Sequence, residues 1–376
     1  MNQSLKLLRA GFATFSMFFG AGNILFPLAV GFETQAECYW AVWGLLLTAV
    51  LIPFLGLTVM ARYQGDYRTF FGRLGRIPGF CIASLIILLL GPLGSTPRCI
   101  ALAYATMKVS IPHLSAYGFS VGSCALILFC TLKRRALLDV LGYFLTPVLL
   151  ATLTFVIVLG VIGAPDAAPS SYSPSSAFWL GLTEGYFTMD LLAAFFFASV
   201  IIRGIRRDLG DKASDQQVVI QTFKASAIGA SLLGFVYVCF GWMAAHHGGS
   251  IAGLTTERLL GALMRHILGE GAGVAAALII SLACLTTAIA LTSVFAEYLS
   301  LAVFGGRLTY SAALLLTTAV TCVVSMAELM SILAFLGPVL EWLYPLLILL
   351  TLYNLFTPAK NRDSTLETCA PEAVEC

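Results

Sequence analysis

Charged side chains are scarce in this chain of 376 residues. Asp, Glu, Lys and Arg together make up 11% of the residues, whereas a soluble domain has about 25%. Hydrophobic residues make up 59%. The composition argues against a water-soluble fold and predicts an all-α polytopic membrane protein, because helices satisfy their own backbone groups in lipid.

Sequence motifs of several common chemistries are missing as well. The ten cysteines form no C-x-x-C pair and no zinc spacing, and neither H-E-x-x-H nor G-x-S-x-G occurs. No basic patch with interleaved aromatic residues indicates a nucleic-acid partner. The sequence therefore predicts no catalytic residues, no cofactor and no resident metal. Its expected partners are the lipid bilayer and a small molecule, and no feature assigns an oligomeric state.

Long apolar runs are abundant instead. About 20 apolar residues cross the hydrocarbon core as a helix. Ten candidate segments result: 7–31, 39–61, 79–107, 117–132, 138–163, 178–202, 222–245, 272–302, 309–326 and 329–355. Lys and Arg concentrate in alternate connections, which places both termini in the cytosol and predicts a multi-pass protein of the cell (inner) membrane.

The connection 164–177 divides these segments into two groups of five. Because five is odd, the second group enters the membrane in the opposite orientation. We therefore expect a single transmembrane domain over 1–376 that contains two inverted repeats, 5–163 and 177–355. A polar tail, 358–376, follows on the cytosolic side.

Glycine, asparagine and proline interrupt the first segment within Phe19-Gly20-Ala21-Gly22-Asn23-Ile24-Leu25-Phe26-Pro27. Irregular backbone survives at membrane depth only where it faces protein, water or a ligand. An inverted repeat predicts a matching interruption in the sixth segment, and the run from Thr183 to Asp190 supplies one. Discontinuous first and sixth helices that meet near the midplane predict a secondary transporter, and they favour a carrier over a passive channel.

The two interruptions offer complementary chemistry. The N-terminus of a half-helix suits a carboxylate, and unwound carbonyl groups suit a small cation. Thr286 and Thr287 in the eighth segment add hydroxyl oxygens at a similar depth. The alternative for these threonines is a hydrogen bond to a carbonyl group of their own helix.

Four stretches together resemble the branched-chain amino acid:cation symporter family, the BrnQ-type carriers. They are Gly20–Asn23 with Phe26-Pro27, Gly91-Pro92-Leu93 with Thr96-Pro97-Arg98, Gly185-Tyr186 with Thr188-Met189-Asp190, and Ala283–Ala288. The resemblance extends to about residue 350, and that family is similar to LeuT-type inverted-repeat carriers. Members usually have two further helices after the tenth, so the resemblance implies nothing about oligomerisation or about stability that depends on those helices.

The resemblance implies a symporter that imports leucine, isoleucine and valine with a sodium gradient by alternating access. Sodium is then the coupling ion, and no other cofactor is implied. The substrate-binding residues would be Gly20, Ala21, Gly22, Asn23, Tyr186, Phe187, Thr188 and Met189. The cation-binding residues would be Ser16, Phe19, Ala283, Thr286 and Thr287.

Arg98 and Asp190 are charged residues inside predicted spans, where a charge costs about 3 kcal/mol or more. We expect gating or coupling roles for both. Asp190 would tie the unwound backbone or couple the cation. Counting along continuous helices places Arg98 nearer the outside, where it would join Glu184 in an outer gate, pair with Asp190 or extend towards the interface.

Glu297 is a third gating candidate, near the inner end of the eighth segment. It would pair with Lys6 or Arg9 as an inner gate, or lie at the interface. Two alternative functions stay open. One is a proton-coupled neutral amino acid transporter with Asp190 as the proton carrier, and the other is an intramembrane enzyme, for which no nucleophile or metal motif is found.

Overall fold

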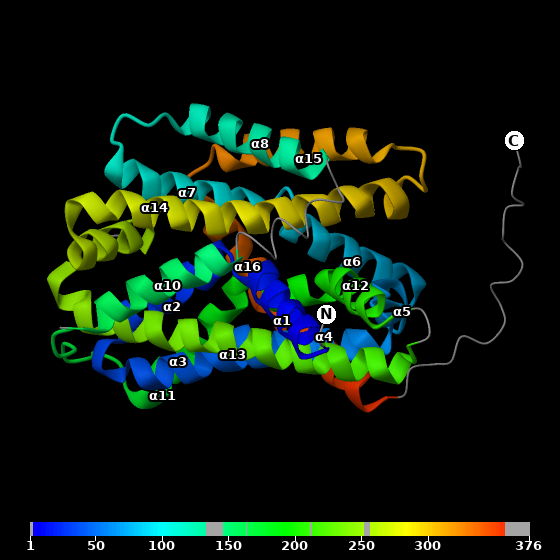
Figure 1. The fold of residues 1–376 in the computed structure, drawn as a ribbon, viewed down its shortest axis with the longest axis horizontal. Helices are drawn as coiled ribbons and strands as arrows, with labels where there is room; N and C mark the ends of the chain where they lie inside the picture. Colours follow the sequence, from blue (N-terminus) through cyan, green and yellow to red (C-terminus); the bar gives the residue numbers. More distant parts are fainter. Residues whose placement is uncertain (1–2, 133–145, 163, 211–212, 252–255, 358–376) are drawn as a thin grey trace, which may run out of the picture.

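The computed structural model describes residues 3–132, 146–162, 164–210, 213–251 and 256–357. Every regular element in these ranges is a helix (Figure 1). The first half contains α1 (Gln3–Phe18), α2 (Ala21–Thr34), α3 (Cys38–Leu46), α4 (Ile52–Arg62), α5 (Tyr67–Gly72), α6 (Arg76–Leu90), α7 (Ser95–Ser110), α8 (Ala116–Leu132) and α10 (Thr146–Val161). The second half contains α11 (Pro174–Glu184), α12 (Asp190–Leu209), α13 (Asp215–His247), α14 (Thr256–Tyr298), α15 (Tyr310–Ser325) and α16 (Leu329–Phe356).

Several of these helices are long and apolar enough to span a membrane. Five stretches meet this description: Ala21–Arg62, Arg76–Lys108, Asp215–His247, Ile280–Val303 and Leu329–Phe356. A sixth span is a pair of helices bent by 40°, Pro174–Thr188 with Asp190–Leu209. The shorter apolar helices Ala116–Leu132, Leu150–Val161 and Tyr310–Ser325 fall on three further expected segments. The expectation of a polytopic all-α protein is confirmed, while the tail 358–376 lies outside the described residues.

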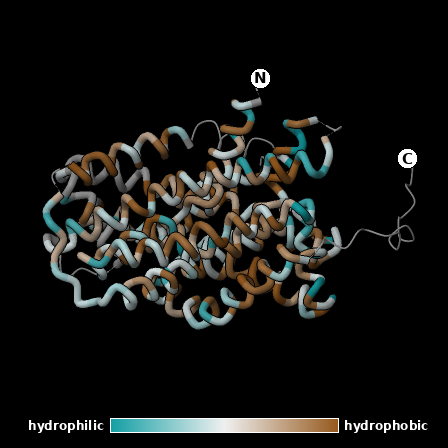
Figure 2. The backbone as a smooth tube through the Cα atoms, turned by 90° about the horizontal axis from the view of Figure 1, so that it is seen from below, coloured by the Kyte–Doolittle hydropathy of each residue, from teal (hydrophilic) through white to brown (hydrophobic). Residues whose placement is uncertain are grey.

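The outside of the helix bundle is apolar. Large hydrophobic side chains such as Trp342, Val323 and Leu349 are 86%, 70% and 65% exposed. Apolar positions dominate the helices through the body of the molecule, and hydrophilic positions are more frequent towards the two ends of its long axis (Figure 2). Such a surface is suited to lipid, since contiguous exposed apolar area marks a membrane or protein contact.

The packing of the helices follows the expected two-fold relationship. The first segment, α1 and α2, packs against α13, which is the second segment of the other half. In the reciprocal contact, α11 and α12 of the sixth segment pack against α3 and α4 of the second segment. The third segments of the two halves also meet, because α7 packs along α14 (Figure 1). Each half therefore completes its core with the other.

The first and sixth helices are discontinuous, as expected. Helix α1 ends at Phe18 and α2 begins at Ala21, and Gly20 between them is extended, with φ −136° and ψ −161°. In the sixth segment a 3-10 turn, Gly185–Thr188, follows α11. Met189 then adopts left-handed backbone with φ +63° before α12 begins.

The third segment is also broken, contrary to expectation. Helix α6 ends at Leu90 and α7 begins at Ser95, so the expectation of one helix over 79–107 is wrong. The intervening residues are Gly91-Pro92-Leu93-Gly94. Proline has no backbone N–H to continue a helix, and two glycines permit the turn. As a result, Arg98 lies in the first turn of α7, beside the interrupted sixth helix.

Candidate functional site

The two interrupted helices are joined by a buried hydrogen-bond cluster. Asn23, in the first turn of α2, donates from Nδ2 to Oδ2 of Asp190 at 2.6 Å. The same amide nitrogen donates to the hydroxyl group of Tyr237 on α13 at 2.6 Å. Tyr237 in turn donates to Oδ2 of Asp190 at 3.1 Å. All three side chains are at most 3% exposed, so the cluster is enclosed by protein.

Asn23 also shapes the interruption of the first helix. Its Oδ1 accepts a hydrogen bond of 3.1 Å from the backbone N–H of Gly20. A continuous α1 would direct this N–H to the carbonyl group of Ser16, four residues earlier. The carboxamide oxygen of Asn23 thus accepts from the otherwise unpaired N–H of Gly20, and its nitrogen donates to the carboxylate of Asp190 in the sixth helix.

The interruption of the sixth helix has its own side-chain partners. Thr188 donates from its hydroxyl group to the carbonyl group of Gly185 at 2.9 Å. Tyr344 on α16 accepts a hydrogen bond from the backbone N–H of Leu191 at 3.2 Å and donates to the carbonyl group of Thr48 at 3.3 Å. Tyr344 therefore links the start of α12 to the second segment of the first half.

Arg98 lies against the same interruption and is 1% exposed. Its guanidinium group donates from Nη1 to the carbonyl group of Phe187 and from Nη2 to that of Thr188, the latter at 3.4 Å. The guanidinium carbon also lies 5.6 Å from the ring centre of Phe26. These carbonyl groups lie at the C-terminal end of the half-helix, where the helix dipole is negative, and they stabilise the buried positive charge.

The surroundings of Arg98 distinguish between its expected roles. The interfacial hypothesis is wrong, because the side chain is buried. Within the described residues, no ion pair within 4.0 Å joins Arg98 to Asp190 or to Glu184. Arg98 and Asp190 nevertheless line one cavity, although the count along the sequence predicted different depths for them. That estimate assumed a continuous third helix.

The residues proposed for cation binding fall into two contacts. Thr287 donates from its hydroxyl group to the carbonyl group of Phe19, at the interruption of the first helix, at 2.9 Å. Thr286 donates to the carbonyl group of Ala283 on its own helix at 2.7 Å. The within-helix alternative therefore describes Thr286 but not Thr287. Ser16 is buried in the last turn of α1.

A small cavity lies between the interrupted helices. Polar or glycine residues form one part of its lining, and they are Gly20, Gly22, Asn23, Ser95, Arg98, Thr188, Asp190 and Thr287. Apolar side chains complete it: Met17, Phe18, Ala21, Leu90, Met189, Ala193, Phe197 and Leu291. Its volume is about 10 Å³, roughly the room for one water molecule. This conformation is closed, and a bound amino acid requires the cavity to widen.

Two residues proposed for substrate binding are not among the residues that line this cavity. Tyr186 stacks on Tyr344, with ring centres 4.7 Å apart. Phe187 packs against Phe26, with ring centres 5.7 Å apart. Both aromatic rings hold the 3-10 turn against its neighbours. The other substrate candidates, Gly20–Asn23 with Thr188 and Met189, do line the cavity.

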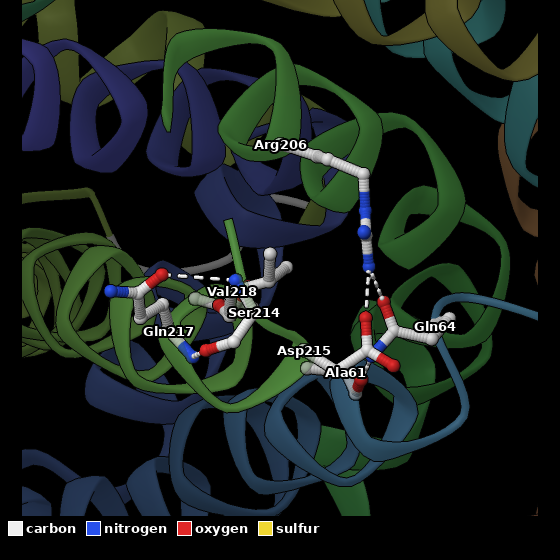
Figure 3. A network of polar contacts seen from close by, with 8 residues as sticks. Ala61, Gln64, Arg206, Ser214, Asp215, Gln217 and Val218 are labelled. Carbon is white, nitrogen blue, oxygen red and sulfur yellow. Dashed lines mark hydrogen bonds and ion pairs between the residues drawn. The ribbon is translucent and has the colours of Figure 1, made fainter. Parts of the chain in front are cut away.

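A separate polar cluster joins helices at the end of the molecule that contains the start of α1. Lys6 donates to the backbone carbonyl group of Asp208 at 2.6 Å, and Arg9 forms an ion pair with the Asp208 carboxylate. Nearby on α12, Arg206 contacts Gln64 and the carboxylate of Asp215 (Figure 3). Asp208 is a partner for Lys6 and Arg9 that the sequence did not predict, and the role of Glu297 stays a prediction.

Tyr237 and Tyr344 are the members of the site that sequence reasoning missed. Both lie in the middle of long apolar helices and are 0% exposed. A buried tyrosine hydroxyl group usually has a hydrogen-bond partner. A tyrosine in the middle of a predicted span could therefore have indicated a buried polar partner.

The family model described as "Branched-chain amino acid transport protein" matches residues 3–370. The chain belongs to this family. Among its relatives, the branched-chain amino acid transport system 2 carrier protein of Pseudomonas aeruginosa is 33% identical over 370 residues, covering 94% of this chain and 81% of the relative. Members of the family are named as transport carriers and not as enzymes.

Two solved transporters share the fold of this carrier. One is Mhp1, a nucleobase-cation-symport-1 family transporter, in a closed conformation with bromovinylhydantoin bound. It has a TM-score of 0.64 and 14% identity, over 91% of this chain and 77% of that one. The other is MhsT in complex with L-phenylalanine, with a TM-score of 0.56 and 16% identity, over 91% and 87% of the two chains. The five-plus-five inverted repeat is thus the fold of this carrier.

Proposed function

We propose that this carrier imports leucine, isoleucine and valine in symport with sodium, by alternating access around the cavity between its interrupted helices. The observation that supports this most directly is the hydrogen bond from Asn23 to Asp190. It joins the first turns of α2 and α12, whose N-terminal N–H groups attract a carboxylate. The apolar part of the cavity lining suits a branched aliphatic side chain.

The proposed sodium site lies beside this substrate site. The carbonyl group of Phe19 and the hydroxyl group of Thr287 are already in contact at 2.9 Å. The carbonyl groups of Ser16 and Ala283 and the hydroxyl group of Thr286 are the further proposed ligands. Oxygen ligands of this kind suit a hard cation. A cation that bound here would pull the interruption of the first helix towards α14.

Transport requires each end of the cavity to open in turn. We propose that both termini are cytosolic in the cell membrane, as the distribution of Lys and Arg predicts. The contacts of Lys6 and Arg9 with Asp208 would then close the cytosolic side. Glu297 remains a candidate for the same gate, and Arg98 holds the sixth helix through the carbonyl groups of Phe187 and Thr188.

Proton coupling is the second candidate, and one observation favours it. Asp190 is 3% exposed, and the neutral groups of Asn23 and Tyr237 donate hydrogen bonds to its carboxylate. A carboxyl group in such surroundings is a chemically reasonable proton carrier. The driving ion therefore distinguishes the two candidates.

Uptake of labelled leucine into proteoliposomes tests the proposal. The protein is given an inward sodium gradient, an inward proton gradient or neither. Sodium symport predicts accumulation with the sodium gradient alone. Accumulation driven only by the proton gradient would establish the second candidate, and the absence of gradient-driven uptake of any neutral amino acid would overturn both.

A further inference from the structure

Arg98 and Asp190 are opposite charges that line the same cavity without pairing with each other. Each is at least 97% buried, with 1% and 3% exposure. Within the described residues no ion pair within 4.0 Å joins them. Removing two charges from water without pairing them is costly. An arrangement of this kind is stabilised when a ligand supplies the missing opposite charges.

The guanidinium group of Arg98 has donors to spare. An arginine has five N–H groups. In Arg98, Nη1 donates to the carbonyl group of Phe187, and Nη2 makes a long contact of 3.4 Å with that of Thr188. Its Nε is buried and has no hydrogen-bond partner in the described part of the chain. The Nε and Nη groups of one guanidinium form a fork that fits the two oxygens of a carboxylate.

The carboxylate of Asp190 can accept further hydrogen bonds. Asn23 and Tyr237 both donate to Oδ2 of Asp190, and neither of them bonds to Oδ1. A carboxylate has about four lone-pair positions. Oδ1 is therefore the position at which a cationic N–H donor would complete the hydrogen bonding of Asp190.

The backbone of α2 lies directly against Arg98. A Cβ atom at Gly22 would lie 2.9 Å from Nη2 of Arg98 and 3.1 Å from Cα of Thr188. The glycine therefore allows the N-terminal turn of α2 to reach the guanidinium group. A carboxylate bound here would meet the positive end of a helix and a guanidinium charge together.

We propose that Arg98 and Asp190 form a receptor for a zwitterion, in which Arg98 binds the α-carboxylate of the substrate and Asp190 binds its α-ammonium group. The inference rests on the proposed transport of amino acids and defines the recognition element at that site. A free amino acid carries both charges on neighbouring atoms, so it satisfies both residues at once. The site therefore selects zwitterions over amines and over carboxylic acids that have the same side chain.

Competition binding separates the two halves of this receptor. In this experiment, purified protein in sodium buffer is incubated with labelled leucine. Unlabelled leucine, 4-methylpentanoate or 3-methylbutylamine is then added as the competitor. The first analogue lacks the ammonium group and the second lacks the carboxylate. In the unaltered protein we expect leucine to bind about 100-fold more tightly than either analogue, because each analogue leaves one buried charge unpaired.

The variants Asp190→Asn and Arg98→Gln should each abolish one preference only. In Asp190→Asn, labelled 4-methylpentanoate should bind within about threefold of leucine, because the ammonium group has lost its partner. In Arg98→Gln, 3-methylbutylamine should approach leucine in the same way. The exposed residues Asp166 and Arg203 provide matched controls, Asp166→Asn and Arg203→Gln, which should keep the full preference for leucine.

The ratio of two affinities within one variant does not depend on how much of the protein is folded. An unchanged ratio in both variants would overturn the receptor. A folded Asp190→Asn protein that binds neither ligand would also overturn it, since the carboxylate half is expected to survive. Failure of the proposed function looks different, because the unaltered protein would then bind no leucine at all. If Asp190 were the proton carrier, its variant would change the pH dependence and keep the preference for zwitterions.

Discussion

Asn23 donates a hydrogen bond of 2.6 Å to the carboxylate of Asp190, across 167 positions of the sequence. Asn23 lies in the first turn of α2, and Asp190 is the first residue of α12. One side chain thus joins the two helices whose interruptions create the cavity. The same side chain accepts from the N–H of Gly20, so the geometry of the first interruption and the position of the sixth helix are coupled.

Replacement of Asn23 by alanine should remove this coupling. Asp190 and Tyr237 would each lose a buried donor, at about 1–3 kcal/mol for each unsatisfied group. We expect a lower midpoint of thermal unfolding in detergent together with at least a tenfold loss of leucine uptake. Asn354→Ala is the matched control, because that amide is 0% exposed and bonds to Tyr63 outside the cavity. It should lower stability and retain transport, and equal losses of uptake in both variants would contradict a special role for Asn23.

Tyr237→Phe removes one hydroxyl group from the cluster and changes the volume little. The hydroxyl group accepts from Asn23 and donates to Asp190. Its loss should raise the leucine KM by about tenfold, in line with about 1.4 kcal/mol for a buried hydrogen bond. The control is Tyr104→Phe, whose hydroxyl group donates to the carbonyl group of Leu114 away from the cavity. A Tyr237→Phe protein with unaltered kinetics would show that the cluster only packs the helices.

Thr287→Val tests the proposed sodium site. The substitution keeps the shape of the side chain and removes the oxygen that contacts the carbonyl group of Phe19. We expect half-maximal uptake to need at least about tenfold more sodium, because a hard cation loses one oxygen ligand. Thr317→Val removes a buried hydroxyl group that bonds within α15, and its sodium dependence should match that of the unaltered protein. The same sodium curve in both variants would remove Thr287 from the cation site.

The interruptions of the first and sixth helices could be predicted from the sequence, because unpaired backbone groups are costly in lipid. Gly20, Gly22 and Asn23 interrupt an apolar run, and backbone groups left unpaired there are unstable in lipid unless they face protein, water or a ligand. The inverted repeat then predicted the matching interruption at Gly185–Asp190. The interruption at Gly91–Gly94 was missed, since the surrounding run is apolar and long enough to span without it. The predicted depth of Arg98 therefore rested on a continuous helix that the structure does not contain.

The partners of the charged residues could not be predicted in the same way. Counting residues along a helix gives the depth of a side chain but not the direction in which it points. Tyr237 lies 47 positions from Asp190, on a different helix. Lys6 and Arg9 contact Asp208, a partner that depth and charge along the sequence did not indicate. Such pairings depend on the rotation of each helix, which packing determines.

The central claim is that the substrate binds between the interruptions of the first and sixth helices, and Gly22→Leu tests it most directly. Any side chain at this position meets Nη2 of Arg98 at 2.9 Å and Cα of Thr188 at 3.1 Å. Gly204 on α12 has no atom within 4 Å of an added Cβ, so Gly204→Leu is the control. The measurement is sodium-driven uptake of labelled leucine by proteoliposomes that contain equal amounts of folded protein. The account predicts no accumulation by Gly22→Leu and normal accumulation by Gly204→Leu, and normal accumulation by Gly22→Leu would contradict it.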